Sequence, residues 1–311
     1  MKYIKWFKEL NKKDIPIAGG KGANLGEMFN KFPIPDGFVI TSNAFKEFIE
    51  KSKIGNQIYS ILKKLNVENT EELERDAAGI QSLIKEQDIP KQIRDEIAKA
   101  YSNLNGNVAV RSSATAEDLP TASFAGQQAT YLDVSGTAFV IKAVQKCWAS
   151  LFTARAIYYR QTKGFDHEKV LMAVVIQKMV NSKKAGVIFT VNPVFKDTNQ
   201  IIIEAAFGLG ETVVSGGITP DNYVVEKKPL KIKDKIINKQ MWGLFTDKKT
   251  GKAIKKDILE EGEKQKLTDK EIIELAKIAI EIEKHYKKPQ DIEFAIDNKI
   301  HIVQSRPITT L

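Results

Sequence analysis

Cysteine, histidine and arginine are scarce in this chain. Among its 311 residues there are one Cys and three His, and only six of the 48 basic residues are Arg. The single Cys147 excludes a disulfide within the chain and is typical of a reducing compartment, so we expect a cytoplasmic protein. The formal net charge of +9 comes mainly from Lys residues spread along the chain. Because nucleic-acid-binding surfaces usually cluster Arg and aromatic residues, we expect no nucleic-acid partner.

Long hydrophobic runs are also missing. The longest, Val170–Ile176, suits a buried strand, whereas a helix that spans a membrane needs about 20 apolar residues. The first ten residues contain three Lys and no apolar core of the length that a signal peptide requires. We therefore expect neither a membrane segment nor a secretion signal. With 42% hydrophobic residues, a chain of this length can form two lobes, each with its own core.

The periodicity of apolar residues predicts an α+β fold. A capping-box pair, Thr268 and Glu271, marks the start of the last predicted helix. The Lys-, Glu- and Asp-rich stretch 239–265 is interpreted as a mobile connection. We expect helices near 22–30, 42–51, 55–65, 71–83, 90–103, 137–159 and 269–286, and strands near 37–41, 107–111, 128–134, 170–177, 186–190, 201–205, 222–226, 231–238, 291–296 and 300–304.

The last two predicted strands indicate a hairpin with one chemically distinctive face. Alternate side chains of a strand share a face, and a two-residue loop at 298–299 would place Glu293 opposite Gln304, and Asp291 opposite Arg306, on one face. Parity then places His301 on the other face. Carboxylate and amide oxygens suit Mg²⁺, and Arg binds phosphate oxygens. Taken alone, these residues fit equally an ordinary exposed hairpin with two cross-strand pairs.

Two earlier segments have the character of phosphate-binding sites. The glycine-rich stretch Gly19–Glu27 contains Lys21 and precedes a predicted helix, so its backbone N–H groups and the positive helix end would favour an anion. It is not a Walker A loop, because Gly22 follows the Lys. Arg111 ends an apolar strand and opens a long polar loop, a length that is unusual unless the loop binds something. The alternatives are a structural turn and a flexible surface loop.

Two weaker segments complete the set of candidates. Residues 177–180 follow an apolar strand and could offer backbone groups to an adenine edge, although a plain core strand has the same pattern. Glu211 lies beyond a strand that ends in glycines. It could meet a ribose hydroxyl or a metal-bound water, or simply cap a turn.

Taken in order, these segments identify a resemblance to a known family. The chain resembles the N-terminal nucleotide-binding domain shared by phosphoenolpyruvate synthase (pyruvate, water dikinase), pyruvate phosphate dikinase and rifampin phosphotransferase. The matching segments are Gly-Gly-Lys-Gly-Ala-Asn-Leu-Gly (19–26), Ile-Pro-Asp-Gly-Phe-Val-Ile-Thr (34–41), Val-Arg-Ser-Ser-Ala-Thr-Ala-Glu-Asp-Leu-Pro (110–120), Ser-Phe-Ala-Gly-Gln-Gln (123–128), Ala-Gly-Val-Ile-Phe-Thr (185–190), Phe-Gly-Leu-Gly-Glu (207–211), and Gln-Asp-Ile-Glu-Phe with Val-Gln-Ser-Arg-Pro (within 290–307).

The resemblance implies an ATP-grasp fold, in which two α+β lobes hold ATP in the cleft between them. We expect the N-terminal lobe at residues 1–192, with a helical insertion at about 55–103, and the C-terminal lobe with the metal-site hairpin at 193–311. The cofactors would be ATP and Mg²⁺. The implied catalytic residues are Lys21, Arg111 and Arg306, and the implied metal ligands are Glu293 and Gln304. The other implied nucleotide-binding residues are Gly126, Gln127, Thr130, Gln177, Lys178, Met179, Val180, Glu211 and Asp291.

The resemblance also implies a partner. In this family the domain passes a phosphoryl group to a His on a swivelling domain, and a further domain binds pyruvate or the drug. His167, His285 and His301 lack the surrounding motif of that His, so we expect both of those domains to be absent from this chain. The implied function is the Mg·ATP-binding, phosphoryl-donor domain of a phosphoenolpyruvate synthase-like dikinase. The alternatives are a rifampin phosphotransferase-like domain and a non-catalytic nucleotide-binding module.

Overall fold

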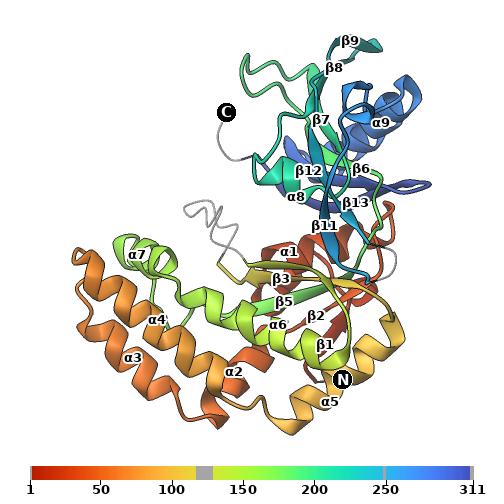
Figure 1. Ribbon diagram of the computed structural model, residues 1–311. Coiled ribbons are helices and arrows are strands. Elements are labelled where there is room, and N and C mark those ends of the chain that lie inside the picture. The colour runs from red at the N-terminus through yellow and green to blue at the C-terminus, as the bar shows by residue number, and fades with distance from the viewer. Residues whose placement is uncertain (1, 117–128, 248–249, 309–311) are drawn as a thin grey trace. The chain divides into compact units, whose positions relative to one another are not determined.

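The computed structural model describes residues 2–116, 129–247 and 250–308. It divides into two compact units, and the chain passes between them three times. The first unit holds the residues up to Asn30 together with Asp36–Met179, and the second holds Lys31–Pro35 together with the residues from Val180 onward. Each unit combines helices with a sheet, so the predicted α+β class is confirmed (Figure 1).

This division differs from the expected lobe boundary after residue 192. Strand β6 (Lys184–Phe189) pairs with strands β7 (Gln200–Phe207) and β12 (Gln290–Ile296), so it belongs to the sheet of the second unit. The short segment Lys31–Pro35 also belongs there. Its Pro33 carbonyl accepts a hydrogen bond of 2.9 Å from the Ile302 N–H, at the edge of that sheet.

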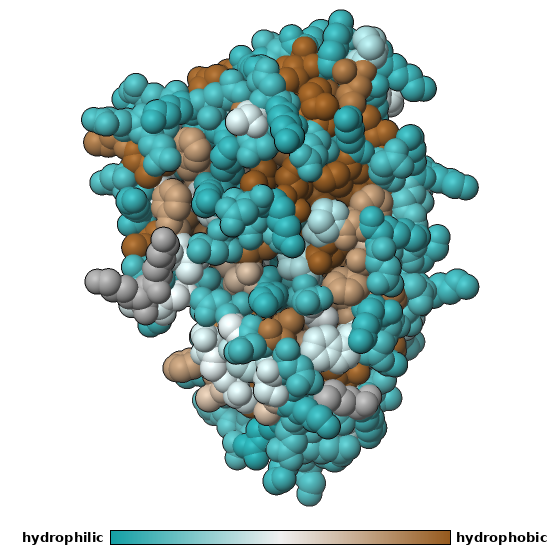
Figure 2. All heavy atoms as spheres, turned by 90° about the vertical axis from the view of Figure 1, so that its right-hand side faces the viewer, coloured by the Kyte–Doolittle hydropathy of each residue, from teal (hydrophilic) through white to brown (hydrophobic). Residues whose placement is uncertain are grey.

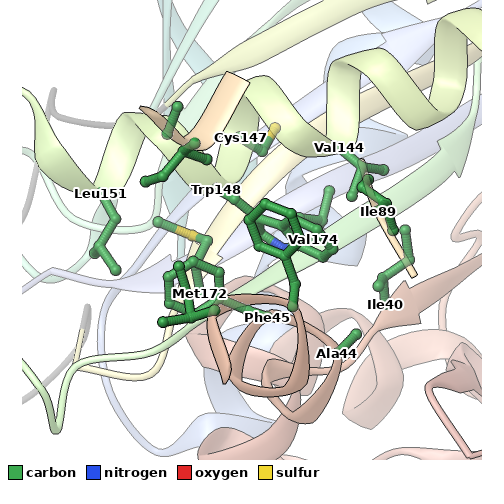
Figure 3. Packing of buried hydrophobic residues seen from close by; sticks show 14 of the residues in the cluster. Ile40, Ala44, Phe45, Ile89, Val144, Cys147, Trp148, Leu151, Met172 and Val174 are labelled. Carbon is green, nitrogen blue, oxygen red and sulfur yellow. The ribbon is translucent and has the colours of Figure 1, made fainter. Parts of the chain in front are cut away.

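The first unit is built on a sheet with the strand order β1-β2-β5-β3-β4. One face of this sheet packs on helices around Trp148, whose ring stacks on Phe48 at 4.9 Å and lies beside Phe45 (Figure 3). Its elements are β1 (Ile4–Trp6), η1 (Phe7–Glu9), η2 (Lys12–Asp14), α1 (Ile15–Phe29), β2 (Gly37–Ile40), α2 (Ser42–Lys51), α3 (Gly55–Lys64), α4 (Thr70–Glu86), α5 (Lys91–Leu104), β3 (Val108–Ala114), β4 (Thr130–Val134), α6 (Thr137–Ala149), η3 (Ser150–Phe152), α7 (Ala154–Thr162) and β5 (Met172–Lys178).

The helix expected over 137–159 is interrupted. It divides into α6 and α7 because Thr153 adopts an extended backbone and caps α7, with its hydroxyl accepting a hydrogen bond of 3.3 Å from the Ala156 N–H. Thr is a good N-cap residue, and this local bond competes with a continuous helix. The helical segments expected near 42–51, 55–65, 71–83 and 90–103 correspond to α2, α3, α4 and α5.

The second unit is built on an antiparallel sheet with the order β13-β12-β6-β7-β8-β9. One face packs against α9, whose side chains Ile272, Leu275, Ala279 and Ile282 are fully buried. Helix α9 begins with the predicted capping box between Thr268 and Glu271. Besides β6, β7 and β12, the second unit contains α8 (Glu211–Val214), β8 (Asp221–Lys227), β9 (Leu230–Ile236), β10 (Trp242–Thr246), β11 (Ala253–Asp257), η4 (Glu261–Glu263), α9 (Asp269–Tyr286) and β13 (Ile300–Pro307).

The stretch expected as a mobile connection contains ordered structure instead. Strands β10 and β11 pair with each other, and Gln240 fixes the segment to β7. Its side-chain amide accepts a hydrogen bond of 2.9 Å from the Phe207 N–H and donates one of 3.0 Å to the Phe207 carbonyl. The abundance of Lys and Glu in this stretch reflects its solvated side and not a lack of fixed structure.

A buried ion pair anchors the end of the same stretch. The ammonium group of Lys266 lies 3.0 Å from the Asp221 carboxylate, and both side chains are completely buried. The carboxylate also accepts hydrogen bonds from the Tyr223 hydroxyl at 2.7 Å and from the Asn238 N–H at 3.0 Å. A carboxylate in this position is stable only because each of its oxygens is bonded.

Within the described ranges, none of the helices combines the length and the apolar composition needed to cross a bilayer. Hydrophilic residues cover much of the face drawn in Figure 2, with hydrophobic residues visible between them. Exposed apolar residues of this kind are normal on a protein surface and call for no partner.

The buried ion pair of Asp221 and Lys266 should contribute strongly to the stability of the fold. Replacing Lys266→Met should lower the free energy of unfolding by about 3–5 kcal/mol, because it leaves a buried carboxylate without its cation. The double variant Asp221→Asn, Lys266→Met should recover part of that loss. Lys264→Met, at an exposed position two residues earlier, is the control and should be nearly neutral. Urea unfolding measures all three, and a loss below about 0.5 kcal/mol for Lys266→Met would contradict the argument.

Candidate functional site

The predicted cross-strand pairs of the last hairpin are present. In the second unit, Glu293 lies opposite Gln304, and Asp291 lies opposite Arg306. Because side chains alternate along a strand, all four lie on the face of the sheet opposite the one that packs on α9. The apolar neighbours Ile292 and Phe294, with exposures of 0% and 1%, point into the core. The hairpin therefore presents its polar groups as one set.

The pairing of β12 with β13 is reached through a different turn from the one expected, and this changes the sheet face on which His301 lies. The turn between the strands has three residues, not two, so Ile296 pairs with Ile300 and Ala295 with His301. A β-bulge at Val303 then adds one residue to β13 and restores the expected pairing from Glu293 onward. His301 consequently shares the face of Ala295 and Glu293. The expectation that it lies on the opposite face was wrong, because the parity count assumed a two-residue turn.

The side-chain amide of Gln304 has a hydrogen-bond partner for its nitrogen but none for its oxygen among the described residues. Its side-chain amide donates a hydrogen bond of 3.0 Å to Glu293 Oε1. This orientation follows from charge, since the reverse orientation would set the amide oxygen against a carboxylate. The amide oxygen Oε1 is buried and has no hydrogen-bond partner among the described residues. A buried acceptor of this kind beside a carboxylate suits a hard cation such as Mg²⁺.

Asp291 and Arg306 form an ion pair beside this pair. The guanidinium Nε donates a hydrogen bond of 2.8 Å to Asp291 Oδ2, and its Nη2 lies 2.7 Å from the same oxygen. Burial raises the pKa of the Asp291 carboxyl, Arg306 lowers it, and the carboxylate of Glu293 raises it again, so that the pKa ends above its ordinary value. The site thus holds carboxylate charge that a further cation would stabilise. Arg306 is half-exposed and is positioned by Asp291.

The glycine-rich segment forms a sharp turn in the first unit. Within α1, Gly19 has a φ of 67° and interrupts the helix, so a new helical start lies just before Lys21. Ser113 of β3 fixes this turn, since its hydroxyl donates to the Ala18 carbonyl at 2.8 Å and accepts from the Gly22 N–H at 3.2 Å. Sequence reasoning passed over Ser113, although it lies only two residues after Arg111.

Arg111 lies on the same side of the first sheet as this turn. It is buried in β3 and pairs with Thr130 of β4 and Val175 of β5. By alternation Arg111, Ser113 and Gln177 share one face, on which α1 packs. The side-chain Nε2 of Gln177 is buried and has no partner among the described residues. The first unit therefore brings Arg111, Gln177 and the Gly19 turn to one sheet face.

The other residues expected to bind the nucleotide lie in different surroundings. The N–H groups of Lys178 and Met179 already donate to the Asp36 and Asn107 carbonyls at 2.8 and 2.9 Å, so these donors are not available to an adenine edge. Val180 packs in the second unit with Ala185 and Ala295. Glu211 is an exposed residue at the start of α8. The expected residues Gly126 and Gln127 lie outside the described ranges.

The described residues contain no ready-made cluster of metal ligands. Within 2–116, 129–247 and 250–308, no three His, Cys, Asp or Glu side chains are placed to hold a metal ion together. The assignment of Glu293 and Gln304 as metal ligands stays a prediction, because Mg²⁺ is commonly held by only one or two protein groups together with phosphates and water.

Comparison with protein families decides the affiliation. Residues 15–311 match the family described as pyruvate phosphate dikinase, AMP/ATP-binding domain. The chain belongs to this family. The resemblance drawn from the sequence motifs is thereby confirmed, together with the ATP-grasp-like domain that the family implies.

Curated relatives match the whole chain or nearly all of it. The chain is 48% identical to a probable phosphoenolpyruvate synthase of Pyrococcus abyssi, covering 100% of this chain and 44% of that protein. It is 50% identical to the one of Methanocaldococcus jannaschii, covering 100% and 27%, and 51% identical to that of Archaeoglobus fulgidus, covering 99% and 42%. The chain thus spans less than half the length of these relatives.

The tight contact of the Gly19 turn with Ser113 should make this position sensitive to substitution. A Cβ at Gly19 would lie 2.2 Å from the Ser113 carbonyl oxygen, whereas one at Gly164, with a similar φ of 69°, would meet nothing within 4 Å. Both Ala substitutions incur the cost of a positive φ, roughly 1–3 kcal/mol. At Gly19 the ψ of 174° adds to it, because this combination of angles is essentially restricted to Gly. Gly19→Ala should therefore destabilise the protein clearly more than Gly164→Ala. Thermal unfolding compares the two, and equal losses would show that the contact with Ser113 is not restrictive.

Proposed function

We propose that this chain is the Mg·ATP-binding, phosphoryl-donor domain of a phosphoenolpyruvate synthase-like dikinase. In the full enzyme, ATP, pyruvate and water would yield phosphoenolpyruvate, AMP and phosphate. The observation that carries the proposal is the hairpin face of the second unit, where a buried amide oxygen of Gln304, without a partner among the described residues, lies beside the Glu293 carboxylate. The names of the curated relatives support phosphoenolpyruvate synthase over the rifampin alternative.

In this proposal the second unit supplies the cation-binding groups. Glu293 and Gln304 would hold Mg²⁺, which when bound would neutralise charge on the phosphate oxygens. Arg306 would bind a phosphate oxygen, and its contact with Asp291 fixes the direction of the guanidinium. An Arg held in this manner loses little conformational freedom when it binds an anion.

The first unit would supply cationic groups for the polyphosphate. Lys21 follows the glycine turn at a new helical start, where the positive end of the helix dipole favours anions. Arg111 would bind phosphate from the adjoining strand. Fixed positive groups of this kind stabilise charge that spreads over the transferring phosphoryl group, and they need little rearrangement during the reaction. Thr130, paired with Arg111, adds a hydroxyl at the start of β4.

The phosphoryl acceptor would be a His on a swivelling domain. That domain would lie in the same polypeptide of the full enzyme or be supplied in trans, and its presence is supported by the greater length of the relatives. We place the protein in the cytoplasm, where ATP is supplied and where a buried thiol such as Cys147 stays reduced.

Binding of Mg·ATP tests the metal face. The parent chain should bind ATP in a Mg²⁺-dependent manner and gain thermal stability from it by mass action. Glu293→Ala and Gln304→Ala should each weaken that binding by on the order of tenfold or more, as expected for loss of a bond to a charged group. Lys299→Ala, at the exposed hairpin turn, is the control. Calorimetry that finds no Mg²⁺-dependent binding by the folded parent would refute the proposal.

Phosphoryl transfer tests the first unit. With a swivelling domain added in trans, labelled ATP should transfer label to the His of that domain. Lys21→Ala and Arg111→Ala should each slow the transfer by on the order of a hundredfold, the usual effect of losing one group that stabilises transition-state charge. Label that stays on the swivelling domain during gel analysis at mildly alkaline pH identifies that domain as the phosphoryl acceptor. Label on His167, His285 or His301 of this chain would contradict a purely donor role.

A further inference from the structure

The face that carries the hairpin carboxylates continues across the sheet to strand β7. Val187 of β6 pairs with Glu293 on one side and with Glu204 on the other. Residues directly opposite each other point to the same face, so Glu204 lies on the face of Glu293. Neighbouring strands are about 4.8 Å apart, which sets the two backbones roughly 10 Å from each other. Glu side chains that extend over the intervening Val187 can both act on an ion between them.

Glu204 is the one charged residue of strand β7 (Gln200–Phe207), where it interrupts an apolar run and is half-buried. Asn222, its partner on β8, donates a side-chain hydrogen bond to it. Burial raises the pKa of the Glu204 carboxyl, the Asn222 bond lowers it, and the carboxylate of Asp291 raises it again, so that the pKa ends above its ordinary value. Its charge is therefore disfavoured in the protein as it stands.

Three carboxylates thus occupy one sheet face, each with a polar partner from an adjacent strand. Glu204 is bonded to Asn222, Asp291 to Arg306, and Glu293 to Gln304. Three negative groups and the one guanidinium among these six side chains sum to a formal charge of −2. A divalent cation carries the opposite charge. The arrangement is unfavourable by itself and becomes favourable when such an ion is present.

We propose that Glu204 is a positioning residue for the divalent cation that Glu293 and Gln304 would hold. It would act through its charge on the hydrated ion, because its backbone lies two strands, roughly 10 Å, from that of Glu293. Mg²⁺ usually keeps several waters, so a carboxylate can act on the hydrated ion. The inference rests on the proposed function and adds a third strand, β7, to its site.

The test substitutes Glu204→Gln, which keeps the size of the side chain and a hydrogen-bond acceptor for Asn222. In the parent, Mg²⁺ titrated into protein with ATP measures the affinity for the cation. The variant should bind it on the order of tenfold more weakly, the effect expected when one charge is lost several ångströms from a divalent ion. Glu204→Asp, which retains the charge, should keep most of the affinity.

A second measurement separates this role from a structural one. Without metal at pH 7.5, Glu204→Gln should raise the melting temperature, because it removes a half-buried charge near Asp291. A residue that merely stabilises the fold would lower it. The matched control is Glu226→Gln on β8, whose carboxylate contacts Lys231 at 3.2 Å and Lys233 at 3.8 Å. That change should leave the cation affinity unaltered and should not raise the melting temperature.

The outcomes distinguish the inference from the proposed function. If the parent binds Mg·ATP and Glu204→Gln binds it equally well, the role of Glu204 is overturned and the proposed function stands. A melting temperature that falls for Glu204→Gln with and without Mg²⁺ also overturns that role. A folded parent that shows no binding of Mg²⁺ with ATP, and none of Mn²⁺ alone, overturns both proposals.

Discussion

The pairing of Glu293 with Gln304 is the constraint on which the candidate site depends. It decides which way an amide faces, and so leaves a buried carbonyl oxygen beside a carboxylate. The pairing itself depends on the bulge at Val303, because the three-residue turn alone would shift β13 by one residue. Such a shift would turn the polar groups toward the hydrophobic core. The bulge residue Val303 therefore keeps Gln304 and Arg306 on the same face as Glu293 and Asp291.

The electrostatics of the two units are complementary to different parts of the proposed ligand. The second unit gathers carboxylates at positions where burial already disfavours their charge, which suits a cation. The first unit gathers Lys21, Arg111 and a helical start, which suits an anion. A metal–polyphosphate complex carries both kinds of charge. In the proposal, groups of the second unit would bind the metal ion and groups of the first unit would bind phosphate.

Burial of charge has a structural use in this protein as well as a proposed functional one. Asp221 and Lys266 are as deeply buried as any apolar residue, yet the surrounding N–H, hydroxyl and carbonyl groups satisfy them. By contrast, the amide oxygen of Gln304, beside the Glu293 carboxylate, is a buried acceptor without a hydrogen-bond partner among the described residues. The contrast between a completed network and an incomplete one is what separates a stabilising ion pair from a candidate binding site.

By itself the sequence determined the features that depend on neighbouring residues. The capping box at Thr268 and the apolar face of α9 follow from short-range hydrogen bonds and helical periodicity. The pairing of Asp291 with Arg306 was predicted from a two-residue turn, and it holds because the bulge offsets a three-residue turn. The family motifs likewise identified Lys21 and Arg111 as candidates.

Only the tertiary structure decided the features that join distant segments. It placed His301 on the site face through a three-residue turn, placed β6 in the second unit, and brought Glu204 into the row of Glu293 across Val187. It also ordered the Lys-rich stretch 239–265 through Asp221 and Lys266, which are 45 residues apart. These results depend on which strands become neighbours, and strand order is set by the packing of the whole sheet and not by local pattern.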